Sequence, residues 1–281
     1  MEPASLQAAR ENARALATHA GLRAVMLGGS AATGLADEAS DLDLYALGEG
    51  EAPLALRRAL AAARGRPGTA EIAARAFGPT DAWRERSGLE VDLMHWDAAW
   101  LEGEVAARME RHEPRVGYTT AVVHTVAVAV PLHDPSGWLA ELQARARAPY
   151  PEGLARAVLA LNLPLLRASR HSFLQQTEAA LRRGDAVSVN HRTAAWLASF
   201  FDALFALNRR LHPGEKRLGR HAAAVPLAPE ATRKAVEALL RAPPEERPAR
   251  MERLARALEA LAAEAFGGQP FTAPSESPET R

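Results

Sequence analysis

The chain has 281 residues, enough for one large domain or two modest ones with a buried core. Lys plus Arg and Asp plus Glu both total 34, so the chain lacks the strong positive field that draws proteins to nucleic acid or to acidic membrane surfaces. It contains no cysteine, which excludes disulfides, thiolate metal sites and cysteine nucleophiles.

The first residues, MEPASLQAARENARAL, lack the basic-then-apolar order of a signal peptide. The sequence also has no apolar run of about 18 residues that could span a bilayer. We therefore expect a soluble, cytoplasmic protein with no membrane partner.

Residues 5–20 are rich in alanine and predict a helix that ends at Gly21. An apolar strand then leads into Gly28, Gly29 and Ser30. The glycines allow the backbone to approach another group closely, and Ser30 is a good N-cap for a short helix whose free N–H groups favour anions. This stretch predicts a strand followed by a phosphate-binding turn.

A second apolar strand opens with Asp41, Leu42 and Asp43. Side chains alternate along a strand, so Asp41 and Asp43 share one face and Leu42 lies on the other. Two neighbouring carboxylates repel each other unless a cation lies between them. Magnesium prefers a few carboxylates together with substrate phosphates, so the pair indicates a magnesium and nucleotide site.

Further along, a helix is expected from Pro53 to about Arg64, and a strand between residues 69 and 77. Residues 89–95 alternate again, which places Val91 on the core side and leaves Glu90 and Asp92 on the opposite face.

Asp97 predicts the N-cap of a helix that continues to about residue 111. Residues 118–132 could form a helix followed by a strand, and their periodicity does not decide between the two. After a turn at residues 133–137 the pattern is helical, with the strongest core helix around residues 196–205. The expected class is therefore α+β, with a mixed sheet and flanking helices at 1–135, a helical domain at 136–267 and a disordered tail at 268–281.

A polar loop, His212 to Arg220, follows the core helix and carries Lys216 and Arg217. Its cations could contact a triphosphate, where lysine acts as a point charge and arginine as a bidentate clamp. They could equally be basic residues that suit the C-terminal dipole of a helix.

The Gly-Ser turn, the small residues Ala32, Gly34 and Ala36, and Ser40 before the Asp-x-Asp strand resemble the nucleotidyltransferase fold of polymerase-beta type. The most similar branches are the adenylyltransferases that modify aminoglycosides and lincosamides, and the minimal nucleotidyltransferases. The resemblance covers about the first third of the chain. It departs from the minimal members at Thr33, where many of them carry arginine.

The resemblance implies magnesium-dependent transfer of a nucleoside monophosphate, AMP from ATP, to a hydroxyl group of a small molecule. Nucleic acid is not expected as a partner, because the charge of the chain is balanced. The resemblance further implies roles for most of the candidate residues. The implied metal ligands are Asp41, Asp43 and Asp92, the catalytic set adds Glu90, and the nucleotide contacts are Gly28, Gly29 and Ser30. Lys216 is added as a candidate phosphate contact from the basic loop alone and not from the resemblance.

Two questions stay open at this stage. Asp92 either completes the metal site or activates the acceptor hydroxyl, and Glu90 could take the second role. The alternative function is a non-catalytic or protein-modifying interaction protein, such as the minimal nucleotidyltransferase that partners a toxin. The long helical region argues against that alternative, because the minimal partners are short.

Overall fold

The computed structural model describes residues 4–34, 41–76 and 78–268. The chain forms two compact units, one made of residues 1–106 and 125–148 and the other of residues 107–124 and 149–281. The chain therefore crosses between them three times. The domain boundary predicted after residue 135 stays a prediction, and residues 269–281 of the predicted tail lie outside the described residues.

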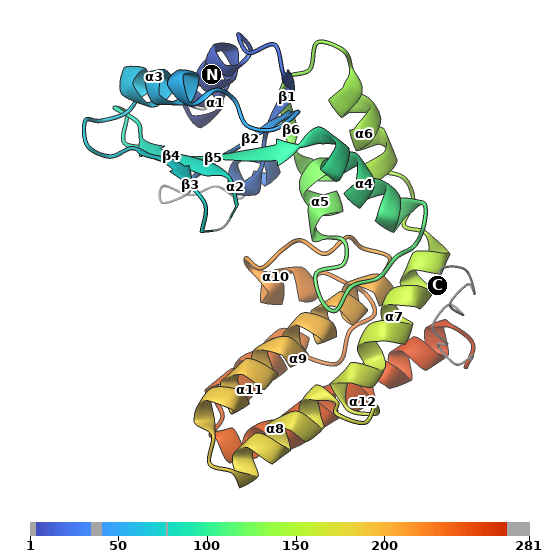
Figure 1. Cartoon of the computed structure of the whole chain (residues 1–281). Coiled ribbons are helices and arrows are strands. Elements are labelled where there is room, and N and C mark those ends of the chain that lie inside the picture. The colour runs from blue at the N-terminus through green and yellow to red at the C-terminus, as the bar shows by residue number, and fades with distance from the viewer. Residues whose placement is uncertain (1–3, 35–40, 77, 269–281) are drawn as a thin grey trace, which may run out of the picture. The chain divides into compact units, whose positions relative to one another are not determined.

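The first unit contains a six-stranded sheet in the order β3-β4-β5-β2-β1-β6 (Figure 1). β2 and β5 run parallel, and the other neighbouring strands are antiparallel. The predicted α+β class, a mixed sheet together with a helical region, is confirmed. The strands are β1 (Leu22–Leu27), β2 (Leu42–Gly48), β3 (Glu71–Ala74), β4 (Thr80–Arg84), β5 (Glu90–Asp97) and β6 (Val130–His133).

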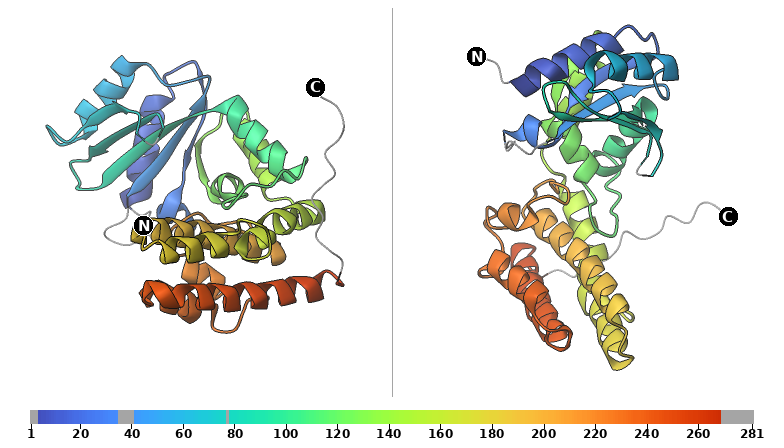
Figure 2. Two further views of the ribbon diagram at one scale, coloured as in Figure 1. Left: turned by 60° about the horizontal axis from the view of Figure 1, so that its bottom comes forward. Right: turned by 90° about the vertical axis from the view of Figure 1, so that its left-hand side faces the viewer.

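Helices α1 (Ala4–Leu16) and α3 (Leu54–Arg64) lie on one face of this sheet (Figures 1 and 2). Alternate strand residues fill the core beneath them, among them Leu44 of β2 and Leu93 of β5, neither of which is exposed to solvent. The predicted alternation is confirmed, because the residues between these core positions are only half-buried. Asp43 of β2 and Glu90 and Asp92 of β5 therefore lie on the other face.

The remaining helices of this part of the chain are α2 (Gly29–Thr33), α4 (Ala98–Met109), α5 (Ala121–Val128) and α6 (Trp138–Ala146). Asp97 caps α4 as predicted, since its Oδ1 accepts from the Trp100 N–H at 2.8 Å. Residues 118–132 form a helix and then a strand, α5 and β6. β4 was not predicted, because its sequence TDAWR has only one large apolar residue, Trp83, and resembles a polar turn.

A buried charged cluster lies on the helix-covered face. Asp81 has no exposed surface, and its carboxylate accepts from Arg57 Nη1 at 3.0 Å and from Ala73 N–H at 2.7 Å. His95 Nε2 lies 2.8 Å from its other oxygen. Burial alone raises the pKa of Asp81, but the contacts with His95, Ala73 and Arg57 outweigh it and lower the pKa. The cluster ties α3 to β4 and β5.

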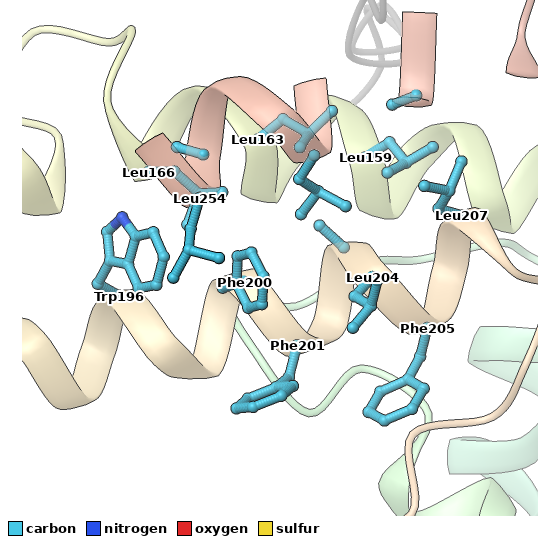
Figure 3. Close-up of a cluster of buried hydrophobic side chains, with 14 of the residues drawn as sticks. Leu159, Leu163, Leu166, Trp196, Phe200, Phe201, Leu204, Phe205, Leu207 and Leu254 are labelled. Carbon is cyan, nitrogen blue, oxygen red and sulfur yellow. The ribbon is translucent and has the colours of Figure 1, made fainter. Parts of the chain in front are cut away.

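The second unit is helical, and its long helices enclose a core of aromatic and aliphatic side chains (Figure 3). Trp196 and Phe200 of the predicted core helix stack with ring centroids 5.0 Å apart. No helix in the described ranges is long and apolar enough to cross a membrane. The helices are α7 (Glu152–Leu166), α8 (Phe173–Arg182), α9 (Ala186–Leu207), α10 (Leu218–Ala222), α11 (Thr232–Arg241), the 3-10 turn η1 (Pro244–Glu246) and α12 (Arg247–Ala265).

A single buried acid, Asp202 of α9, joins two other segments of this unit. Its carboxylate accepts from the N–H of Thr119 at 2.9 Å and from the Thr119 hydroxyl at 2.6 Å. Asn162 of α7 donates to it at 3.3 Å. Burial raises the pKa of Asp202 to about 7, although the Thr119 hydrogen bonds and the charge of Arg108 act in the opposite direction. Asp202 therefore holds a proton in the folded protein at pH values where it has lost it in the unfolded chain.

We predict that Asp202→Asn flattens the pH dependence of stability. In the parent protein the free energy of unfolding should fall as the pH rises from about 4 to about 7, by at most ~1.4 kcal/mol per pH unit for this one proton. Asparagine cannot lose a proton, so the variant should lack this fall. Urea denaturation of both proteins at several pH values measures the difference. Parallel stability curves for parent and variant across this range would contradict the prediction.

Candidate functional site

The turn after β1 is held against β2 by its backbone. The N–H of Gly28 donates to the Asp43 carbonyl oxygen at 2.9 Å. Gly28 occupies the N-cap position of α2, with extended backbone and no side-chain capping bond. The expectation that Ser30 caps this helix is wrong, because the chain turns at Gly28 and the helix has already begun one residue before Ser30.

Neither glycine of the turn leaves room for a side chain. A Cβ atom on Gly28 would lie 2.6 Å from the Tyr45 ring. A Cβ atom on Gly29 would lie 1.7 Å from Asp43 Oδ2, and Gly29 also has a positive φ of 59°. Both positions therefore require glycine, and the Gly29 backbone lies directly beside the Asp43 carboxylate.

Asp43 and Asp92 are partners in the parallel ladder between β2 and β5. Adjacent strands lie about 4.8 Å apart, and paired residues point to the same face of the sheet. Both residues are half-buried. Asp41, also half-buried, comes one residue before β2 and has no partner position in the ladder with β5. The structure thus aligns two of the three predicted carboxylates and leaves Asp41 at the strand entrance.

A cluster of aromatic side chains, which the sequence analysis did not predict, lies beside these carboxylates on the same face of the sheet. Tyr45 follows Asp43 by two residues, and its ring lies 4.4 Å from that of Trp96, which is 5.3 Å from Trp100. Burial, and then the negative charges of Asp43 and Asp92, raise the pKa of Tyr45. The hydroxyl therefore stays protonated beside the carboxylates. The alternation that paired the acids also contained this signal, since Tyr45 and Trp96 occupy even steps from them.

Glu90 lies on the same face at the beginning of β5, opposite Arg84 of β4. Its Oε1 accepts from Arg84 Nε at 2.6 Å, and both side chains are close to half exposed. An exposed ion pair of this kind contributes little stability and can be broken readily. The role of Glu90 as a base stays a prediction.

The described part of the structure does not place the remaining predicted residues on this face of the sheet. Lys216 is exposed and belongs to the second unit, so its contact with a nucleotide stays a prediction. Ala36 and Ser40, which contributed to the sequence resemblance, lie outside the described residues.

The donor set of this face suits a hard cation that brings other ligands with it. Within residues 4–34, 41–76 and 78–268, no three His, Asp or Glu side chains are grouped as a metal site. Asp43 and Asp92 could supply oxygen ligands, and the close approach of Gly29 to Asp43 leaves backbone rather than a side chain beside it. Magnesium commonly combines one or two carboxylates with substrate phosphates, so the two aligned carboxylates fit that ion.

We predict that Gly29→Ala destabilises the protein more than Gly34→Ala. Both glycines have positive φ, 59° and 70°, so alanine is strained at either position by about 1–2 kcal/mol. Only at Gly29 would the new Cβ atom also collide with Asp43, since nothing lies within 4 Å of a Cβ at Gly34. Chemical denaturation of both variants measures the difference, and equal losses would show that Asp43 does not crowd the turn.

Residues 118–218 match the model of a domain of unknown function, DUF4037. No curated protein matches the chain. The chain is similar to the crystal structure of a nucleotidyltransferase-like protein from Exiguobacterium sibiricum 255-15, with a TM-score of 0.46 and 15% sequence identity. That similarity covers 94% of this chain and 77% of the other.

Proposed function

We propose that the chain is a magnesium-dependent nucleotidyltransferase that moves a nucleoside monophosphate, AMP from ATP, onto a hydroxyl group of a small molecule. The observation that carries the proposal is the alignment of Asp43 with Asp92 beside the side-chain-free turn at Gly29. This arrangement combines carboxylate ligands for a cation with a backbone that a phosphate group can approach closely.

In the proposed site the turn binds the triphosphate. Gly28 and Gly29 present backbone instead of side chains, and Ser30 supplies a hydroxyl in the first turn of α2. Asp43 and Asp92 hold magnesium, with Asp41 at the strand entrance as a further oxygen ligand. When bound, magnesium offsets the negative charge on the phosphate oxygens during transfer.

The transfer needs one proton acceptor. The acceptor hydroxyl attacks the α-phosphorus, the bond to the pyrophosphate leaving group breaks, and the hydroxyl proton must pass to a base. Glu90 is two residues from Asp92 on the same face, roughly 6.6 Å along the strand at ~3.3 Å per residue. Arg84 donates to Oε1 of Glu90, so Oε2 is the oxygen that would take the proton. Asp92 is the other candidate, because it already lies beside Asp43.

We predict that Asp43→Asn and Asp92→Asn each weaken binding of magnesium with a non-hydrolysable ATP analogue by roughly 10-fold to 100-fold, since a charged contact is worth about 1.5–3 kcal/mol. Stability should change little or increase, because each substitution removes repulsion between neighbouring carboxylates. Isothermal titration calorimetry measures the affinity. Glu71→Gln, which neutralises an exposed acid on β3, is the matched control and should bind like the parent. Unchanged affinity in both aspartate variants would contradict the proposal that Asp43 and Asp92 bind magnesium.

Lys216 is proposed as a cation for the triphosphate. Lys216→Met keeps most of the apolar stem and removes the charge. We expect a raised KM for the nucleotide, or a lowered kcat if the contact strengthens in the transition state, with a total loss of roughly 10-fold to 100-fold and little change for the acceptor. Lys234→Met, at another exposed lysine of the second unit, is the control. If both variants behave like the parent in steady-state kinetics, the loop has no nucleotide contact.

A further inference from the structure

A groove between α8 and α9 has a strongly basic lining. It encloses a cavity of about 350 Å³ and lies wholly within the second unit. Arg182, Arg183 and Arg192 line it together with His171, and no Asp or Glu is among its lining residues. The chain as a whole has balanced charge, so this is a local concentration of positive charge.

The three arginines have no ion pair within the part of the chain that the structure describes. Neighbouring helices of the same unit show the opposite arrangement, in which several arginines form ion pairs with a glutamate four residues away. These pairs are Arg233 with Glu237, Arg250 with Glu246, and Arg256 with Glu252. Glu178 lies four residues before Arg182, but within the described residues the two side chains form no ion pair. In the groove the guanidinium donors are left available for an external acceptor.

One residue that lines the groove, His171, is held in place by hydrogen bonds. His171 has a positive φ of 66°, which is uncommon for a residue other than glycine. Gln175 accepts from its N–H at 3.1 Å, and Gln176 donates to its carbonyl oxygen. Both glutamines also line the cavity. The strained conformation of His171 is therefore held by the helix that carries Arg182 and is followed directly by Arg183.

The carboxylate nearest in sequence to these arginines is already engaged. Asp185 caps α9, and it accepts from the N–H of Ser188 at 3.0 Å and from the Ser188 hydroxyl at 2.6 Å. These hydrogen bonds, and to a smaller extent the charge of Arg183, lower the pKa of Asp185, so it stays ionised as a cap. One carboxylate at the turn cannot neutralise three guanidinium groups.

We propose that this groove binds the phosphate group of a small phosphorylated molecule, at a site separate from the nucleotide site of the first unit. The guanidinium group presents a planar fork of donors that matches phosphate oxygens, and several arginines around one cavity allow several such contacts. The cavity is at the lower end of the about 300–1,000 Å³ range of small-molecule sites, so it suits one phosphorylated group and not an extended polymer.

The test is calorimetric titration of the full chain with sodium tripolyphosphate and, separately, with inorganic phosphate, in about 0.15 M salt so that diffuse charge effects are screened. EDTA is present to keep divalent metal out of the first unit. One saturable site is expected in the parent protein. Arg183→Gln and Arg192→Gln should each weaken it about 10-fold or more. Tighter binding of tripolyphosphate indicates a polyphosphate ligand, and equal binding indicates a single phosphate group.

Arg253→Gln is the matched control, because Arg253 is an exposed arginine of α12 without an ion pair among the described residues, and it should bind like the parent. Asp43→Asn with Asp92→Asn should also leave this binding unchanged, which separates the groove from the proposed nucleotide site. The proposal is overturned by absence of saturable binding, or by an equal loss in Arg253→Gln. It is also overturned if the groove variants lose affinity only for single-stranded RNA or for phosphatidylserine vesicles.

Discussion

The parallel pairing of β2 with β5 aligns Asp43 with Asp92, and the candidate site depends on that register. A shift of one residue in the register of β5 would turn Asp92 toward the face covered by α1 and α3 and would bring Leu93 to the opposite face, because side chains alternate along a strand. The register is fixed by the core, where Leu44 and Leu93 are partners with no exposed surface. The backbone carbonyl oxygen of Asp43 in β2 also accepts the Gly28 N–H, so β2 positions both the turn and the Asp43 carboxylate.

The carboxylates on the two faces of this sheet differ in how their negative charge is balanced. On the covered face Asp81 is fully buried, and Arg57 and His95 compensate it, as a buried carboxylate requires. On the other face Asp43 and Asp92 are neighbours of like charge, and ionised neighbours repel each other. Such a pair is unfavourable unless a cation or hydrogen-bond donors offset the repulsion, and the proposed function assigns that role to magnesium.

Local sequence patterns predicted much of this fold. The alternation of side chains placed Glu90 and Asp92 on the correct face of the sheet, and Asp97 was recognised as a helix cap. The features that local patterns did not predict depend on contacts between segments that are distant in sequence. β4 exists because it pairs with β5 and buries Trp83, although its own sequence resembles a turn. The need for glycine at position 29 comes from the Asp43 side chain, which is remote in sequence. The free arginines between α8 and α9 become a group only when the helices pack together.

The phosphate sites proposed in the two units differ in the groups that would contact phosphate. Carboxylates repel phosphate, so Asp43 and Asp92 can serve a phosphate ligand only through a cation that both share. The arginines of the α8–α9 groove bind such a group directly, without an intervening ion. Under these two proposals, affinity for phosphate at the first site depends on magnesium concentration, whereas affinity at the groove depends on ionic strength and not on magnesium. The fixed His171 at the groove and the crowded Gly29 at the turn show that both surfaces are preorganised by their own unit.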